Sequence, residues 1–147
     1  MKHRLRPAAI LAIALAFLSC DDTIVEPRAP GAVVTFAFSG SADLMDVHVR
    51  KASTIAAARA YLQTQAGPKF PIGPIARGAG ADPYYPFHFL PDQVDLAEVA
   101  MELCDGRPMK TEAAVEQFFA GTGRANEQTT TYCPWGAYPV AVRDSVP

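Results

Sequence analysis

Apolar positions along the chain follow two spacings, one typical of strands and one typical of helices. Residues 32–38 are β-branched and aromatic and predict a first strand. Residues 47–50 alternate apolar and polar side chains, which predicts a second strand. Ser53 or Thr54 is expected to cap a helix that runs to about Gln65. The apolar positions of this helix recur every three to four residues: Ile55, Ala58, Tyr61 and Leu62.

The second half of the chain contains a proline-rich segment and then further periodic segments. Residues 70–86 are rich in proline and glycine and are predicted to be mostly irregular. Residues 87–90 predict a short strand, and residues 94–104 predict the longest strand, with a bulge where the apolar phase shifts. A second helix is expected after Pro108, and residues 137–142 predict the final strand.

The order of these elements predicts the fold class. Strands come first, a helix interrupts them, and a second helix and a polar loop at residues 122–131 precede the last strand. Strict alternation of strand and helix is absent, which disfavours a doubly wound parallel sheet. We therefore expect an α+β domain with an antiparallel sheet, two helices packed on one face of it, and one disulfide.

The N-terminus combines a basic flank with a short apolar run. Lys2, Arg4 and Arg6 precede residues 8–18, which are apolar without interruption. This run is too short to span a membrane, which needs about 20 residues, and it is typical of a secretory signal. The run stops just before Cys20, so we expect cleavage there and attachment of lipid to the Cys20 sulfur. The alternative is an ordinary signal peptide that leaves Cys20 as a free thiol.

The signal divides the chain into three parts. Residues 1–19 are expected to be a lipoprotein signal peptide, residues 20–31 a flexible tether and residues 32–147 a single domain. The tether contains two prolines and little apolar material, and it would extend to at most about 35 Å. The expected location is the bacterial cell envelope, with the protein attached to the inner or the outer membrane through its lipid.

Charge and motif content narrow the classes of partner. Removal of residues 1–19 leaves ten Lys and Arg against fifteen Asp and Glu, so the domain is a poor candidate for binding nucleic acid. The chain has no Gly-rich phosphate loop followed by Lys and Ser or Thr, and no Gly-x-Ser-x-Gly motif. Neither Cys-x-x-Cys nor His-x-x-x-His occurs. We expect no cofactor and no metal.

If Cys20 carries lipid, Cys104 and Cys133 remain as a pair in an exported protein. An oxidising compartment favours a disulfide between them. Such a bond would connect the end of the predicted longest strand to the beginning of the last one. Two buried thiols, or a metal held together with His88, are the alternatives.

Three short motifs occur in order along the chain: Tyr85-Pro-Phe-His-Phe, Glu102-Leu-Cys-Asp and Cys133-Pro-Trp. This series resembles the N-terminal domain of a slime-mould calmodulin-binding protein, a small domain also found in exported bacterial proteins. The resemblance covers residues 33–143 and departs at residues 40–46, which look like an insertion. It supports the predicted fold and disulfide and implies no particular activity. Calmodulin binding is not expected, because bacteria lack calmodulin and the chain has no basic amphipathic helix.

The same motifs contain the candidate site residues. His88 lies between two phenylalanines, so it should face away from the core, where Tyr85, Glu102, Asp105 and Trp135 could join it in a pocket. There it could bind a ligand or act as a general base, or it could be a structural histidine. Glu102 and Asp105 could form an acid–base pair, although Asp105 could equally organise a turn. Trp135 could be a stacking platform or could pack on the disulfide.

These observations predict a binding domain more readily than an enzyme. We expect a lipid-anchored envelope domain without catalytic activity, which binds an envelope protein or a small ligand through an edge formed by Tyr85, His88 and Trp135. The alternative is an envelope hydrolase that uses His88 with Glu102 or Asp105.

Overall fold

The computed structural model describes residues 31–99 and 107–145. Its elements are β1 (Ala32–Phe38), β2 (Leu44–Val49), α1 (Ala52–Thr64), β3 (Phe70–Arg77), β4 (Phe87–Phe89), β5 (Asp95–Ala97), α2 (Glu112–Gly121), β6 (Thr129–Tyr132) and β7 (Ala137–Asp144). The predicted first strand coincides with β1, and the first predicted helix coincides closely with α1. No helix in the described part of the chain is long and apolar enough to cross a membrane.

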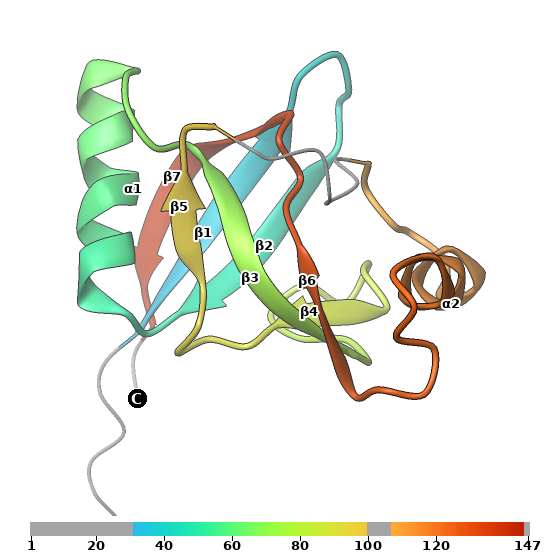
Figure 1. Cartoon of the computed structure of the whole chain (residues 1–147). Coiled ribbons are helices and arrows are strands. Elements are labelled where there is room, and N and C mark those ends of the chain that lie inside the picture. The colour runs from blue at the N-terminus through green and yellow to red at the C-terminus, as the bar shows by residue number, and fades with distance from the viewer. Residues whose placement is uncertain (1–30, 100–106, 146–147) are drawn as a thin grey trace, which may run out of the picture.

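The strands form two antiparallel sheets (Figure 1). In the first sheet, β1 lies between β2 and β7. In the second sheet, β3 pairs with β4, β5 and β6. The predicted α+β class is therefore confirmed, but the prediction of a single sheet is wrong, because β3 organises a sheet of its own.

β3 lies in the segment that its prolines predicted to be irregular. Pro71 and Pro74 have no N–H to donate, which normally excludes proline from the middle of a sheet. Each partner strand covers only part of β3, however: β5 pairs with residues 70–72 and β4 with residues 75–77. The Pro74 carbonyl still accepts a hydrogen bond from the Leu90 N–H at 2.9 Å. The strand therefore tolerates prolines that a fully paired strand would not.

The first sheet buries one of its faces by ordinary two-residue alternation. The side chains of alternate residues on β1 and β2 form its buried face: Ala32, Val34, Phe36, Phe38, Met45, Val47 and Val49. The residues between them are partly or fully exposed. This pattern is the one that the apolar spacing of the first strand predicted.

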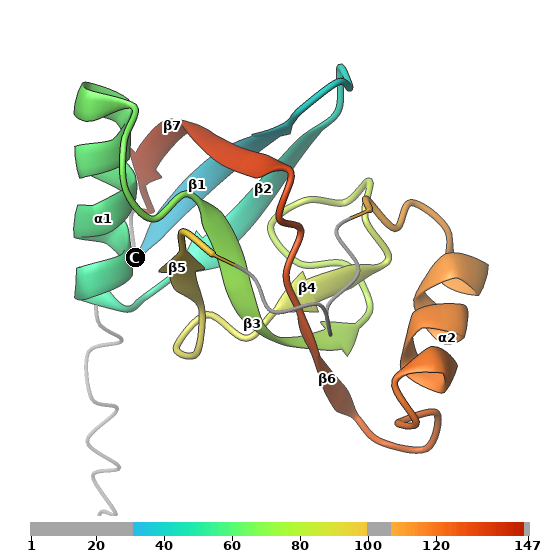
Figure 2. The same cartoon turned by 45° about the horizontal axis from the view of Figure 1, so that its top comes forward.

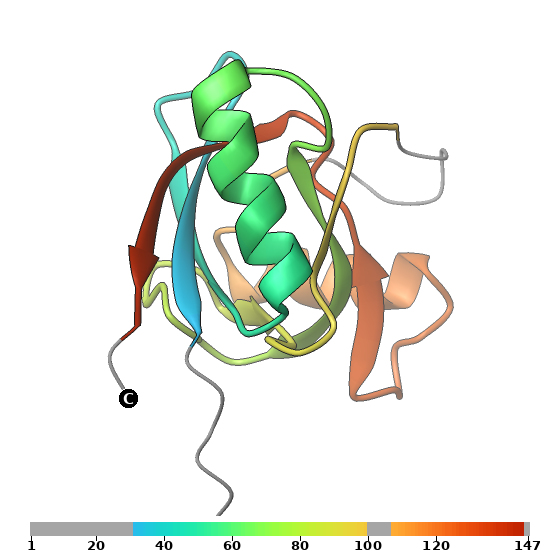
Figure 3. The ribbon, with the colours of Figure 1, turned by 90° about the vertical axis from the view of Figure 1, so that its left-hand side faces the viewer.

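The two helices lie at opposite ends of the molecule (Figures 1 and 2). α1 covers the open side between the two sheets, beside β7 and β5 (Figure 3), and it buries Ile55, Ala58 and Tyr61. α2 lies beyond β6 and buries Val115 and Phe119. The prediction that both helices pack on one face of a sheet is therefore wrong, because two packed sheets leave two separate openings to cover.

Arg77, at the end of β3, connects the second sheet to α2. Its guanidinium donates two hydrogen bonds to the Glu116 carboxylate and two more to the carbonyls of Glu127 and Ala125. It also lies 3.9 Å from the centre of the Phe119 ring. The hydrogen bonds to Arg77 lower the pKa of Glu116, so the ion pair persists as the pH falls through the ordinary range of a glutamate.

The longest predicted strand, residues 94–104, is mostly not a strand. β5 ends at Ala97, and the exposed residues Glu98 and Val99 follow in a bend. The remainder of that segment, including Cys104, lies outside the described residues. Cys133 follows β6 and is fully buried, and its predicted disulfide with Cys104 stays a prediction.

The start of α1 differs from the predicted cap. The residue before the helix is Lys51, which makes no side-chain capping bond, and its ammonium group instead pairs with Asp95 at 2.6 Å. Thr54 is buried and donates its hydroxyl to the Val94 carbonyl at 2.8 Å. The expectation that Ser53 or Thr54 caps the helix is wrong, because the Thr54 hydroxyl connects α1 to the segment before β5.

Thr54→Val is expected to lower the free energy of unfolding by about 1–3 kcal/mol, since it leaves the Val94 carbonyl without its donor. Thr54→Ser keeps the hydroxyl and is the matched control, with an expected loss of about 1 kcal/mol for the missing methyl group. Urea unfolding of the two variants measures the difference. Equal losses would contradict the assigned role of the hydroxyl.

Candidate functional site

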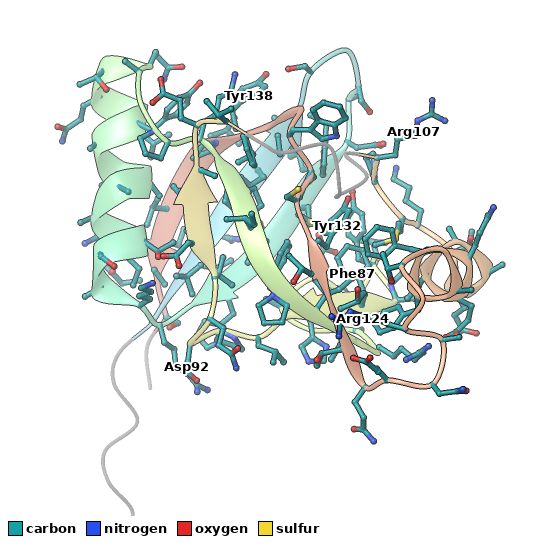
Figure 4. The ribbon with its side chains drawn as sticks, viewed as in Figure 1. Phe87, Asp92, Arg107, Arg124, Tyr132 and Tyr138 are labelled. Carbon is teal, nitrogen blue, oxygen red and sulfur yellow. The ribbon has the colours of Figure 1, made fainter. Side chains whose placement is uncertain are left out.

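The position of β4 follows from the aromatic side chains on either side of His88. Phe87 and Phe89 are buried, and each lies against the ring of Tyr132, with centroids 5.3 Å and 5.8 Å away. Figure 4 shows Phe87 and Tyr132 between β6 and α2, where Phe118 also contacts Tyr132. Because strand side chains alternate between faces, His88 must lie on the other side of β4, as the sequence predicted.

The imidazole of His88 is held in one orientation. Its Nδ1 lies 2.8 Å from the Gly78 carbonyl oxygen, and because a carbonyl can only accept, Nδ1 donates the proton. The Nε2 atom is therefore left with a lone pair and acts as an acceptor. Gly80 lies directly over the ring, since a Cβ at that position would be 2.5 Å from the Cβ of His88.

His88 lies in a cleft of about 160 Å³ between β2, β4 and the loop at residues 80–82. We call it the His88 cleft. Its polar lining consists of Asp46, His48, Asp82, Tyr85 and His88. Apolar walls come mainly from the strands on either side of it: Met45, Val47, Phe87 and Phe89.

The two carboxylates of the cleft have different partners. Asp46 is neutralised by Arg143 at 2.5 Å and also accepts a hydrogen bond from the Thr35 hydroxyl. Asp82 accepts only backbone N–H groups, from Asp46 at 3.1 Å and from Tyr84 at 2.9 Å. No Lys or Arg of the described residues forms an ion pair with Asp82. The cleft therefore contains one carboxylate that is held in place without a countercharge.

Tyr85 is the deepest polar residue of the cleft. Only 2% of its surface is exposed, and its hydroxyl has no hydrogen-bond partner among the described residues. Burial, followed by the negative charges of Asp43 and Asp82, raises the pKa of Tyr85 to about 12. The phenol thus stays protonated at neutral pH and can both donate and accept a hydrogen bond.

A comparison with known families identifies the fold. The family model for the N-terminal domain of the calmodulin-binding protein matches residues 32–145. The chain belongs to this N-terminal domain family. No curated protein and no solved structure matches the chain. Membership confirms the resemblance derived from the sequence motifs, because the matched region contains all three of them.

Only part of the predicted site comes together in this member of the family. Tyr85 and His88 line one cleft, as expected. Trp135 does not line it: this residue is 51% exposed in the turn between β6 and β7, where the Ser39 N–H donates to the Gly136 carbonyl. Figure 4 shows Tyr138, which follows that turn, at the far end of the molecule from Phe87. Glu102 and Asp105 lie outside the described residues.

Sequence analysis missed three polar residues of the cleft. Asp46 and His48 are on β2, and Asp82 is in the loop before β4. His48 lies on the predicted second strand, but nothing in the sequence places that strand beside the loop at residues 80–82. Among the described residues, no three His, Cys, Asp or Glu side chains form a group that could hold a metal ion.

A second, wider groove of about 530 Å³ lies between α2 and the loop before β4. Its charged residues are mostly paired with one another or with neighbours: Arg77 with Glu116, and Lys110 with Asp43. The hydrogen bond from Lys110 lowers the pKa of Asp43. Because these charges are compensated within the protein, the groove offers less to a ligand than the His88 cleft does.

Tyr85→Phe is expected to raise the free energy of unfolding by about 1 kcal/mol at neutral pH, because it removes a buried hydroxyl that lacks a partner. Tyr132→Phe is the matched control. The Tyr132 hydroxyl donates to the Arg107 carbonyl at 2.5 Å, so its loss is expected to lower the free energy of unfolding by about 1–3 kcal/mol. Urea unfolding separates the two, and a destabilised Tyr85→Phe variant would contradict the assignment.

The same variant tests the pKa of Tyr85. The folded protein holds the phenol proton more tightly than the unfolded chain, so this stabilisation is complete below pH 10.0 and is lost as the pH rises to about 12. The unfolding free energy of the wild type should therefore fall relative to that of Tyr85→Phe over this range. A constant difference between the two proteins would show that the pKa of Tyr85 is not raised.

Proposed function

We propose that this chain is a lipid-anchored domain of the bacterial cell envelope that binds a partner or a small ligand without catalysing a reaction. The His88 cleft is the proposed binding site. Tyr85 and His88 keep the role expected from the sequence, and Asp82 takes the place of Trp135 in that site.

The observation that carries the proposal is the buried, unpartnered hydroxyl of Tyr85. A buried polar group without a partner destabilises the folded protein by about 1–3 kcal/mol, and natural proteins rarely keep one without a functional reason. A bound ligand that hydrogen-bonds to this hydroxyl offsets the penalty. The cavity beside Tyr85 supplies the room for such a ligand.

The contacts of His88 favour binding over hydrolysis. In a catalytic Ser-His-Asp arrangement, a carboxylate accepts the Nδ1 proton and stabilises the imidazolium that forms during the reaction. In this protein, the Gly78 carbonyl accepts that proton. A neutral carbonyl stabilises the developing positive charge less than a carboxylate would, so His88 is better suited to accept a hydrogen bond from a ligand.

Membrane attachment is proposed to occur through lipid on Cys20. The domain begins at Gly31, whose carbonyl accepts a hydrogen bond from the Ser145 N–H at 2.9 Å. The two ends of the described domain therefore meet at one end of the first sheet. Residues 20–31 would then connect this end to the membrane.

Expression of the full-length chain in a bacterium tests the anchor. The wild type is expected in the membrane fraction, with N-terminal lipid detected by mass spectrometry on Cys20. Cys20→Ser should abolish lipid attachment and release the protein from the membrane in high salt. Cys20→Ser protein that stays fully membrane-bound would overturn the lipid anchor.

A panel of ester, phosphate, glycoside and peptide substrates tests the absence of catalysis. We expect no turnover above that of the uncatalysed reactions for the purified full-length protein. Turnover that disappears in a folded His88→Ala variant would overturn the binding proposal and support the hydrolase. His48→Ala is a control, since it alters the other imidazole of the same cleft.

We also propose the disulfide between Cys104 and Cys133. In support, Cys133 is fully buried and its sulfur is not free. The bond would close a loop of about 30 residues, which stabilises the fold by roughly 3.6 kcal/mol in a chain-entropy description. Intact mass of freshly exported protein, alkylated with and without reduction, should show one bonded pair. Two alkylated thiols without reduction would overturn the pairing.

A further inference from the structure

We propose that the His88 cleft binds a primary ammonium group, carried by a short alkyl amine or by a lysine side chain. This inference rests on the proposed binding function of the cleft and adds the chemical class of its ligand. It is carried by three features of the cleft: its charge, its hydrogen-bond acceptors and its shape.

The charge of the cleft favours a cation. Arg143 neutralises Asp46, whereas Asp82 forms no ion pair with the described residues. The backbone N–H groups that hold Asp82 use one hydrogen bond on each carboxylate oxygen and leave further lone pairs. An anionic ligand would meet this charge beside the hydroxyl of Tyr85 and be repelled. A cation would supply the missing countercharge.

The acceptors of the cleft match the donors of an ammonium group. An R–NH₃⁺ group has three N–H donors and no acceptor. The cleft offers the carboxylate of Asp82, the hydroxyl oxygen of Tyr85 and the Nε2 lone pair of His88. The Nε2 atom is an acceptor because the Gly78 carbonyl takes the proton on Nδ1. One ammonium group could therefore use an acceptor of each kind.

The walls and the size of the cleft suit a short alkyl chain. Phe87 and Phe89 provide an aromatic wall, and Val47 an aliphatic one. A volume of about 160 Å³ holds about five groups the size of a water molecule, which take up about 30 Å³ each in the liquid. A butylammonium ion, or the end of a lysine side chain, has this size. A guanidinium is planar and wider, and it fits three converging acceptors less well.

Titration of the full-length protein in detergent tests the proposal, with n-butylammonium chloride as the probe and NMR signals of His88 and Tyr85 as the readout. We expect saturable binding. n-Butanol lacks the charge and tetramethylammonium lacks the N–H donors, so each is expected to bind at least about tenfold more weakly. Equal binding of either compound would overturn the ammonium site.

Three variants examine the residues that carry the inference. Asp82→Asn and Tyr85→Phe are each expected to weaken n-butylammonium binding about tenfold. Tyr85→Phe is expected to be at least as stable as the wild type, so its loss of binding cannot be attributed to unfolding. Glu98→Gln removes one exposed carboxylate outside the cleft and should leave binding unchanged. Unchanged binding in both cleft variants would overturn the proposal.

A further pair of probes separates the two sources of the ammonium group. Nα-acetyl-lysine methylamide that binds more tightly than n-butylammonium supports a lysine side chain of a partner protein, and the reverse order supports a free amine. The Nε-acetylated compound should not bind. A cleft that binds acetate or a neutral sugar in preference to all amines overturns the ammonium assignment and leaves the binding function in place. Turnover lost in His88→Ala would instead overturn the binding function itself.

Discussion

The packing of Phe87 and Phe89 against Tyr132 determines where the polar groups of the cleft lie. A strand alternates its side chains, so once these two rings are buried, His88 must point to the opposite side. The same alternation carries Tyr85 inward, where its ring packs edge-on against Phe87. The cleft is thus a by-product of core packing, and its residues cannot move without disturbing the second sheet.

Close packing of the loop before β4 completes the site. Gly80 lies so near to His88 that any side chain would collide with it, and the Gly78 carbonyl fixes the imidazole. Asp82 connects this loop to β2 through the N–H of Asp46. A proline-rich segment without regular structure therefore holds its polar groups as firmly as a strand would, because its backbone and side chains bond to the neighbouring elements.

The sequence predicted local structure better than it predicted assembly. The spacing of apolar residues located β1, α1, β4 and β7, and the flanking phenylalanines predicted the outward direction of His88. β3 was missed because Pro71 and Pro74 resemble loop residues, and nothing local shows that its partners each pair with only part of it. Asp82 was missed for a related reason, since its position beside β2 depends on contacts between residues far apart in the chain. Trp135 was placed in the site because it shares a motif series with His88, but nearness of motifs in a family pattern does not require nearness in space.

The place of β1 at the centre of the first sheet has a mechanical consequence. β1 is the first element of the domain and is bonded on both sides, to β2 and to β7. A force applied to the chain before Gly31 would act along β1, at right angles to the hydrogen bonds of both ladders. Those bonds would have to shear together and could not open one after another. A domain held by its N-terminus is in this way built to keep its shape under tension while its cleft is occupied.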